Sequence, residues 1–318
     1  MASATTSVAA VLTGLSGSDF LSSADTTAQQ TAALLQLATQ LKRGERRIDL
    51  GNRVLGLIFT KASTRTRVSF QVAMARLGGQ TVDLNPQLTQ LGRGEPLEDT
   101  ARVLSRFCDV LAIRTFAQQE LADYAHWASI PVINALTDLE HPCQALADFL
   151  TLQEAFGDLQ GQTLAYVGDG NNVAHSLMLC GALLGVNVRI GCPEGFEPLP
   201  GVVDQARALS VGGAQISVIT DPVEAVRGAQ ALYTDVWASM GQEQEQAERE
   251  RAFQGFCLNE DLLAAGDSRA MVLRCLPAHR GEEISAGVME GPSRRIFDQA
   301  ENRLHAQQAL LAALLGGL

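Results

Sequence analysis

The sequence predicts an α/β protein built from two doubly wound parallel-sheet domains that long helices link. Short apolar runs alternate with helix-like segments along almost the whole chain, which is typical of parallel sheets with helices on both faces. The 318 residues suit two domains, and a hydrophobic content of 46 % lets each domain bury a core. Strand ends of the two domains can then meet in an interdomain cleft, where we expect the active site.

Residues 1–150 are expected to form the first domain. A helical pattern over 25–42 ends at Gly44, and an apolar strand pattern follows over 53–59. The remaining elements, in order, are a polar loop at 60–66, a helix at 68–77, a strand at 80–84, a helix at 96–107, a strand at 110–114, a helix at 121–127 and a strand at 131–134. A long helix over 141–156 would leave this domain.

Residues 151–300 are expected to form the second domain, with Gly157 and Gly161 near its start. Its strands are expected at 163–168, 186–192, 215–219, 231–237 and 270–275, and its helices at 173–184, 202–209 and 222–227. A terminal helix over 301–316 is expected to pack back on the first domain.

Charge and cysteine usage exclude several classes of protein. Twenty-four basic and 35 acidic side chains give a net charge of −11, which disfavours nucleic acid and anionic membranes as partners. No apolar run approaches the roughly 20 residues that span a bilayer. The Ala/Ser/Thr-rich start of the chain lacks the basic residues of a targeting peptide. The six cysteines include no C-x-x-C pair, so we expect reduced thiols in a cytoplasmic protein.

The stretch from Lys61 to Arg67 carries the strongest chemical signal. It lies between a strand and a helix, so the unpaired N–H groups and the dipole of that helix N-terminus would attract an anion. Three hydroxyls and the guanidinium groups of Arg65 and Arg67 add donors that suit a phosphate. A purely structural interpretation makes Ser63 or Thr64 an ordinary N-cap. A basic loop in a net-acidic chain favours phosphate binding.

Polar side chains also stand at other expected strand ends and helix starts. His141 and Gln144 lie about one turn apart at the start of a helix that begins with proline. Asp235 follows a strand and could bind an ammonium group, and Cys275 follows another strand before a loop bent by proline. Taken singly, each has an ordinary structural explanation, namely a satisfied histidine, a capped turn and a small buried thiol.

Two alternatives stay open on these residues. Gly168 to Val173 imitates a dinucleotide-binding fingerprint, with Glu194 near the place of a ribose-binding acid, although Val173 stands where the last glycine belongs. That pattern would indicate a nicotinamide-dependent dehydrogenase. Zinc-competent side chains are present at His141, Cys143, Cys275 and His279. Their spacing matches no familiar structural zinc pattern, so no metal is expected.

Together these stretches resemble the ornithine carbamoyltransferases. The motifs are Ser63-Thr64-Arg65-Thr66, His141-Pro142-Cys143-Gln144, Asp235 with Ser239-Met240-Gly241, and Cys275-Leu276-Pro277. They occur in the family's order, within a resemblance that runs from about Asp19 to Leu315. The resemblance implies transfer of the carbamoyl group of carbamoyl phosphate to the δ-amine of L-ornithine, giving L-citrulline and phosphate in arginine biosynthesis. The Ser-Met-Gly and Cys-Leu-Pro motifs favour ornithine over aspartate as the acceptor.

The resemblance assigns the first domain to carbamoyl phosphate and the second to ornithine. The residues implied for carbamoyl phosphate are Ser63, Thr64, Arg65, Thr66, Gln90 from a neighbouring subunit, Arg114, His141, Gln144, Cys275, Leu276 and Arg303. Those implied for ornithine are Asn172, Asp235, Ser239 and Met240. Arg114, His141 and Cys275 would be catalytic. The family implies a homotrimer, or a multiple of trimers, with no metal and no organic cofactor.

The roles implied by the resemblance suggest a mechanism. A neutral amine attacks the carbamoyl carbon, and Thr66, Arg114 and His141 stabilise the oxyanion. Cys275 is expected across the cleft from Asp235, where the δ-amine arrives. Arg274 stands where the family usually has histidine, so a modified acceptor such as acetylornithine, or putrescine, remains an alternative.

Overall fold

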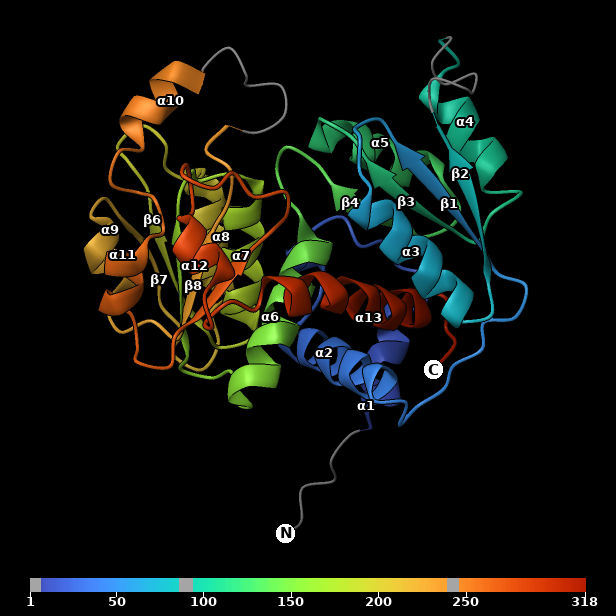
Figure 1. Cartoon of the computed structure of the whole chain (residues 1–318). Coiled ribbons are helices and arrows are strands. Elements are labelled where there is room, and N and C mark those ends of the chain that lie inside the picture. The colour runs from blue at the N-terminus through green and yellow to red at the C-terminus, as the bar shows by residue number, and fades with distance from the viewer. Residues whose placement is uncertain (1–6, 86–93, 239–245) are drawn as a thin grey trace. The chain divides into compact units, whose positions relative to one another are not determined.

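The computed structural model describes residues 7–85, 94–238 and 246–318, and the chain divides into two compact units. Unit 1 comprises Met1–Leu150 with Asn302–Leu318, and unit 2 comprises Thr151–Glu301 (Figure 1). Helix α6 (Pro142–Phe156) and helix α13 (Ile296–Leu314) each continue from one unit into the other. Each unit contains one parallel sheet, which confirms the predicted fold class.

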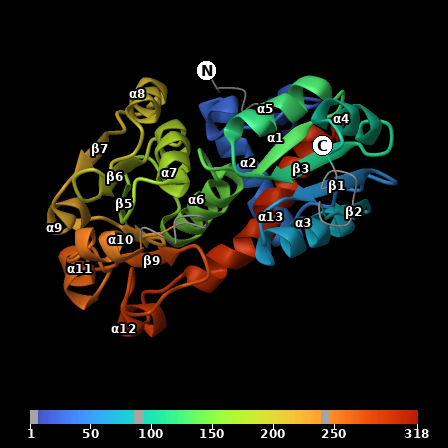
Figure 2. The same cartoon turned by 90° about the horizontal axis from the view of Figure 1, so that it is seen from above.

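Unit 1 holds a four-stranded parallel sheet in the order β2-β1-β3-β4. Its strands are β1 (Val54–Phe59), β2 (Gln80–Leu84), β3 (Val110–Arg114) and β4 (Val132–Leu136). Helix α3 (Arg65–Arg76) covers one face, and α4 (Leu97–Leu104) and α5 (Gln118–Trp127) cover the other (Figure 2). Leu111 and Ile113, two residues apart on β3, pack with residues of α4 and α5. That spacing is the one by which alternate side chains of a strand reach the same face.

Unit 2 holds a five-stranded parallel sheet in the order β7-β6-β5-β8-β9. Its strands are β5 (Thr163–Val167), β6 (Asn187–Gly191), β7 (Ile216–Ile219), β8 (Ala231–Thr234) and β9 (Met271–Arg274). Helices α7 (Asn172–Leu183) and α8 (Pro200–Leu209) cover one face, and α9 (Pro222–Val226) and α11 (Glu260–Ala265) cover the other (Figure 2). The strands are apolar almost throughout because helices bury both faces.

Each sheet has a switch point where the chain changes its winding direction. In unit 1 the switch lies between β1 and β3, where Phe59 pairs with Arg114. In unit 2 it lies between β5 and β8, where Val167 pairs with Thr234. Ligands of such sheets bind outside the carboxyl ends of the strands at these points, because the loops there diverge to opposite faces.

Several helix boundaries differ from those expected. Helix α3 begins at Arg65 rather than at residue 68, and α13 begins at Ile296 rather than at 301. Helix α2 (Ala28–Lys42) begins three residues later than expected. Four short helices were not predicted: α1 (Val8–Leu12), α10 (Gln246–Ala252), α11 and α12 (Ala286–Glu290). Segments of five to seven residues span at most two helical turns, too few to establish an apolar period.

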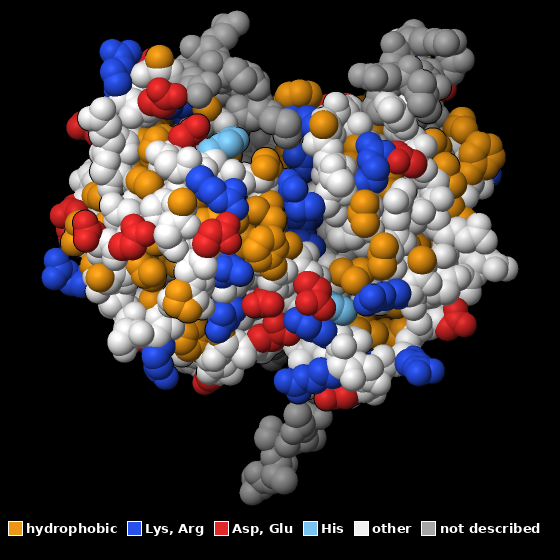
Figure 3. Space-filling view, viewed as in Figure 1, with side chains coloured by type: hydrophobic (Ala, Val, Ile, Leu, Met, Phe, Trp, Pro, Cys, Tyr) orange, Lys and Arg blue, Asp and Glu red, His pale blue; other side chains and the backbone are white. Residues whose placement is uncertain are grey.

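Charged side chains of both signs lie on the surface. Asp and Glu side chains lie intermixed with Lys and Arg side chains on the face shown in Figure 3. Among the described residues, no helix has both the length and the apolar character required to cross a bilayer.

Candidate functional site

The loop after β1 leads into α3 through residues 63 to 66, beside the switch point of unit 1. Thr64 occupies the N-cap position but has helical angles (φ −81°, ψ −55°), and its side chain makes no capping hydrogen bond. Thr64 is therefore the N-cap of α3 by position, but it does not cap the helix through its side chain as an ordinary N-cap does. Ser63 is half-buried, Thr64 and Arg65 are exposed, and Thr66 is buried within the first turn of α3. The start of α3 thus presents Arg65 to solvent beside its N-terminal N–H groups.

Arg67 has a different role from the one expected. Its guanidinium group forms an ion pair with Asp83 of β2 and lies over the Phe59 ring, 5.0 Å from the centroid. We expected Arg67 to add phosphate donors, but this guanidinium instead ties α3 to its own sheet. Arg65 is therefore the arginine of this stretch that remains a candidate for phosphate.

Arg303 joins three elements of unit 1. Its Nη1 donates to Oε1 of Gln144 on α6 at 2.6 Å, and its Nη2 donates to Oγ1 of Thr66 on α3 at 3.1 Å. Gln144 in turn donates to Asp148 at 2.7 Å. All four side chains are buried. Arg303 is thus in direct contact with Gln144 and with Thr66, which lies 237 positions earlier in the chain.

His141 lies among positive charges. Burial lowers its pKa well below 6.5, and the charges of Arg303 and Arg114 lower it further. The imidazole is therefore neutral near neutral pH, and it can donate one hydrogen bond without adding to the local charge. Arg114 ends β3 and is itself buried, so a cation and a neutral donor lie together at the carboxyl edge of the sheet.

Lys61 is a further cation that the sequence analysis passed over. Burial lowers its pKa, and the positive charge of Arg114 lowers it further. Its ammonium group lies 3.9 Å from the centroid of the Phe116 ring. Its position at the start of the same basic stretch was the sequence signal that could have identified it.

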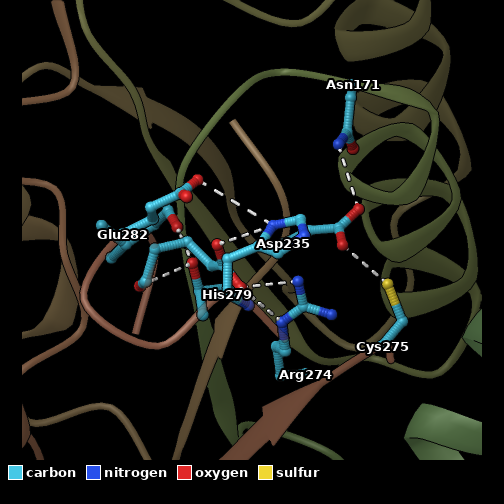
Figure 4. A network of polar contacts seen from close by, with 9 residues as sticks. Asn171, Asp235, Arg274, Cys275, His279 and Glu282 are labelled. Carbon is cyan, nitrogen blue, oxygen red and sulfur yellow. Dashed lines mark hydrogen bonds and ion pairs between the residues drawn. The ribbon is translucent and has the colours of Figure 1, made fainter. Parts of the chain in front are cut away.

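Unit 2 brings Asp235, Cys275 and Asn171 together (Figure 4). Cys275 Sγ donates to Asp235 Oδ1 at 2.8 Å, and Asn171 Nδ2 donates to Asp235 Oδ2 at 3.2 Å. Asp235 is only 5 % exposed. Burial raises the pKa of its carboxyl group above the ordinary value, whereas Arg274, Cys275 and Asn171 act in the opposite direction. The result is a buried carboxylate with two donors already in place.

The position of Cys275 differs from the expected one. We expected it across a cleft from Asp235, but the two side chains are neighbours. Strands β8 and β9 pair in parallel with Thr234 opposite Arg274, so the residue after each strand emerges at the same edge. The asparagine that contacts Asp235 is Asn171, which the sequence analysis did not select. Asn172 is the half-buried first residue of α7, and its role stays a prediction.

Arg274 and Glu283 form an ion pair whose two side chains have no exposed surface. Nε and Nη2 of Arg274 donate to Oε1 of Glu283 at 2.9 and 2.6 Å. The Arg274 backbone N–H donates to Gln299. A buried guanidinium is tolerated only with such a partner, and the pair carries no net charge.

Comparison with known proteins yields two adjoining family matches. Residues 18–154 match the carbamoyl-P binding domain of aspartate/ornithine carbamoyltransferases, and residues 160–314 match their Asp/Orn binding domain. The chain belongs to the aspartate/ornithine carbamoyltransferase family. A family protein from Prochlorococcus marinus (strain MIT 9313), named ornithine carbamoyltransferase, is 84 % identical over 311 residues, 98 % of each chain.

Solved structures of the family share the fold. Ornithine carbamoyltransferase from Pyrococcus furiosus has 47 % identity and a TM-score of 0.91, with 96 % of this chain and 99 % of that chain covered. The enzyme of the same name from Gloeobacter violaceus has 56 % identity and a TM-score of 0.86, with coverage of 93 % and 98 %.

The dehydrogenase alternative is not supported by family membership or by the glycine loop. A Cβ on Gly170 would lie 2.1 Å from the Pro198 nitrogen, so the chain's own backbone lies against this glycine. The Asn171 side chain caps α7 by accepting from the N–H groups of Val173 and Ala174. In a dinucleotide fold these places are left for the pyrophosphate.

Two of the zinc-competent residues, Cys143 and His279, have contacts within their own units. Cys143 is buried and donates to the Asn134 carbonyl, and burial raises its pKa to about 12. Among the described residues, His279, Glu282 and Glu283 have ligand atoms within 4.8 Å of one another. Glu283 is committed to Arg274, whose positive charge disfavours a cation there.

Some predicted site residues lie outside the described part of the chain. They are Gln90, Ser239 and Met240. Leu276, which follows Cys275, is partly buried against the core of unit 2, and the peptide bond before Pro277 is cis.

Proposed function

We propose that this chain transfers the carbamoyl group of carbamoyl phosphate to the δ-amine of L-ornithine, releasing L-citrulline and phosphate. The observation that carries the choice of acceptor is the buried carboxylate of Asp235, bonded to Cys275 and Asn171. The Arg274–Glu283 pair beside it is neutral in sum, so Asp235 remains the carboxylate that attracts an ammonium group.

Residues of unit 1 bind carbamoyl phosphate in this proposal. Ser63, Thr64, Arg65 and the first turn of α3 receive the phosphate, since an exposed guanidinium beside a helix N-terminus suits a dianion. Thr66, Arg114, His141, Gln144 and Arg303 surround the carbamoyl group. The hydrogen bonds from Arg303 to Thr66 and Gln144 hold these three side chains in place before the substrate arrives.

The reaction is an acyl transfer to nitrogen. The lone pair of the neutral δ-amine forms a bond to the carbamoyl carbon, and the bond from that carbon to the phosphate oxygen breaks. Negative charge grows on the carbamoyl oxygen, where Arg114, Thr66 and neutral His141 stabilise it. The departing phosphate keeps the electron pair, and Arg65 meets its charge. The attacking nitrogen becomes positively charged as its bond to carbon forms, and the proton that it must lose passes to the departing phosphate.

Residues of unit 2 bind the acceptor. Asp235 binds the α-ammonium group, and Asn172, Ser239 and Met240 contact the amino-acid end of ornithine. The Cys275 thiol donates its hydrogen to Asp235, and in this proposal its sulfur accepts a hydrogen bond from the δ-amine. The Leu276 carbonyl is a second acceptor for that amine.

The acceptor preference is tested by measuring carbamoyl transfer to ornithine, acetylornithine, putrescine and aspartate in parallel. We expect ornithine to exceed putrescine and aspartate in kcat/KM by at least about ten- to a hundred-fold, the value of one charged hydrogen bond. Arg274→His should keep this order, since Glu283 already neutralises Arg274. A higher kcat/KM with acetylornithine than with ornithine would contradict the acceptor assignment and implicate Arg274.

The assembly proposed is a cytoplasmic homotrimer, or a multiple of it, that acts in arginine biosynthesis without metal or organic cofactor. Gln90 of one subunit would contact carbamoyl phosphate held by Arg303 of its neighbour. Inactive Gln90→Ala and Arg303→Ala variants, unfolded and refolded together, should therefore regain part of the activity as hybrids. A fully active monomer in sedimentation experiments would be incompatible with this arrangement.

A further inference from the structure

We infer that Arg249 is a positioning residue for the acceptor: together with Asp169 and the Trp237 carbonyl it braces the two segments that carry Asn171 and Asp235. The inference rests on the proposed function for its kinetic part. Arg249 lies on α10, and neither it nor Asp169 has a role in the mechanism above.

The brace consists of two hydrogen bonds from a single nitrogen. Arg249 Nη1 donates to Asp169 Oδ2 at 2.9 Å and to the Trp237 carbonyl oxygen at 2.7 Å. The side chains of the ion pair are only 8 % and 12 % exposed. Low exposure removes water as a competing partner, so both contacts are stronger than surface ion pairs.

The two groups that accept hydrogen bonds from Arg249 lie close in sequence to Asn171 and Asp235. Asp169 lies two residues before Asn171, and Trp237 lies two residues after Asp235. Asn171 and Asp235 are hydrogen-bonded to each other. Arg249 therefore closes a second connection between the same two segments, and the two connections together limit how far the Asp235 carboxylate can move.

Aromatic packing restrains Arg249 and Trp237 as well. The Trp237 ring stacks on Phe253 with centroids 5.6 Å apart, and Phe253 packs edge-on against Phe196 at 4.9 Å. The Arg249 guanidinium lies 5.1 Å from the centroid of the Phe196 ring. A guanidinium anchored on a ring and bonded at two points has one orientation, which is what a positioning residue requires.

The test compares Arg249→Met with Arg251→Met in the full-length protein. Arg251 is an exposed arginine on the same helix, so its replacement controls for general loss of charge. We expect Arg249→Met to raise the KM for ornithine at least about tenfold, with the KM for carbamoyl phosphate within about twofold of wild type. Arg251→Met should change neither constant beyond about twofold.

A double variant separates positioning from stability. Arg249→Met takes from the buried Asp169 carboxylate its ion-pair partner Arg249, which lowers the melting temperature. Adding Asp169→Asn removes that charge, so the double variant should regain thermal stability but keep the high ornithine KM. A double variant with a normal ornithine KM, or equal increases in both substrates' KM values, would overturn the inference.

Tryptophan fluorescence tests the brace without turnover. The chain has two tryptophans, Trp127 and Trp237, so a Trp127→Phe background leaves Trp237 as the sole indole reporter. Arg249→Met should shift Trp237 emission to longer wavelength in the absence of substrate, and an unchanged spectrum would contradict the brace. If the wild-type protein fails to carbamoylate ornithine, the proposed function falls while this spectral test of the brace still stands.

Discussion

Replacing Arg65 with alanine is expected to lower kcat/KM for carbamoyl phosphate by about two to four orders of magnitude. A guanidinium can give a phosphate two charged hydrogen bonds, each worth roughly 1.5–3 kcal/mol. The phosphate is bound in the ground state and carries more charge as it leaves, so both KM and kcat should suffer. Steady-state kinetics at saturating ornithine measure both constants.

Arg67→Ala is the matched control for this variant. Arg67 is two residues further along α3 but is engaged with Asp83 and the Phe59 ring. Its loss should lower thermal stability modestly while kcat/KM changes far less than in Arg65→Ala. Near-normal kcat/KM in Arg65→Ala, or equal losses in the two variants, would refute the assignment of Arg65 to phosphate.

Replacing Asp235 with asparagine is expected to raise the KM for ornithine by about ten- to a hundred-fold and to leave the KM for carbamoyl phosphate almost unchanged. Asparagine keeps the shape of the side chain but removes the charge that pairs with the α-ammonium group. The variant also has one acceptor oxygen instead of two, so one of the two donors, Cys275 or Asn171, loses its hydrogen bond. Initial rates over a range of ornithine concentrations measure the change.

The pH dependence of ornithine binding gives the Asp235 prediction a second measurement. Only the ionised carboxylate binds an ammonium group, and burial raises the pKa of Asp235 above the ordinary value of 3.8. As the solution is acidified, ornithine affinity should therefore begin to fall at a higher pH than it would with an aspartate of ordinary pKa. This acid limb should vanish in Asp235→Asn, and its persistence would assign the titration to another group.

The Cys275→Ala variant tests which end of ornithine Cys275 contacts. Asp235 is assigned to the α-ammonium group, whereas Cys275 is assigned to the reacting δ-amine. The cysteine variant should therefore lose kcat more than it loses carbamoyl phosphate affinity. An effect confined to ornithine KM would place Cys275 with Asp235 at the amino-acid end.

Much of the fold could be predicted because local pattern and turn residues determine it. The apolar strands and the helices between them follow from hydrophobic period, and they require parallel sheets once they alternate. The basic stretch at Arg65 was also visible, since it stood directly after a strand in a net-acidic chain. The start of α3 was placed too late because polar residues in its first turn carry no apolar period.

The candidate site could be predicted only as separate motifs. Asp235 and Cys275 were found one by one, but their contact depends on the pairing of β8 with β9, a register between segments 40 residues apart. Asn171 was passed over in favour of Asn172 because a sequence does not show which of two adjacent asparagines turns toward a neighbouring strand. Arg249 carried no motif at all.

The sequence by itself therefore determined the fold class, the family resemblance and the identity of the chemical groups, since these depend on short-range pattern and composition. Tertiary structure alone decided which groups act in concert. It pairs Arg67 with Asp83 and Arg274 with Glu283. It also places Asp235 as a buried carboxylate beside the neutral Arg274–Glu283 pair. Charge effects depend on distance and burial, and both are properties of the packed chain rather than of residue order.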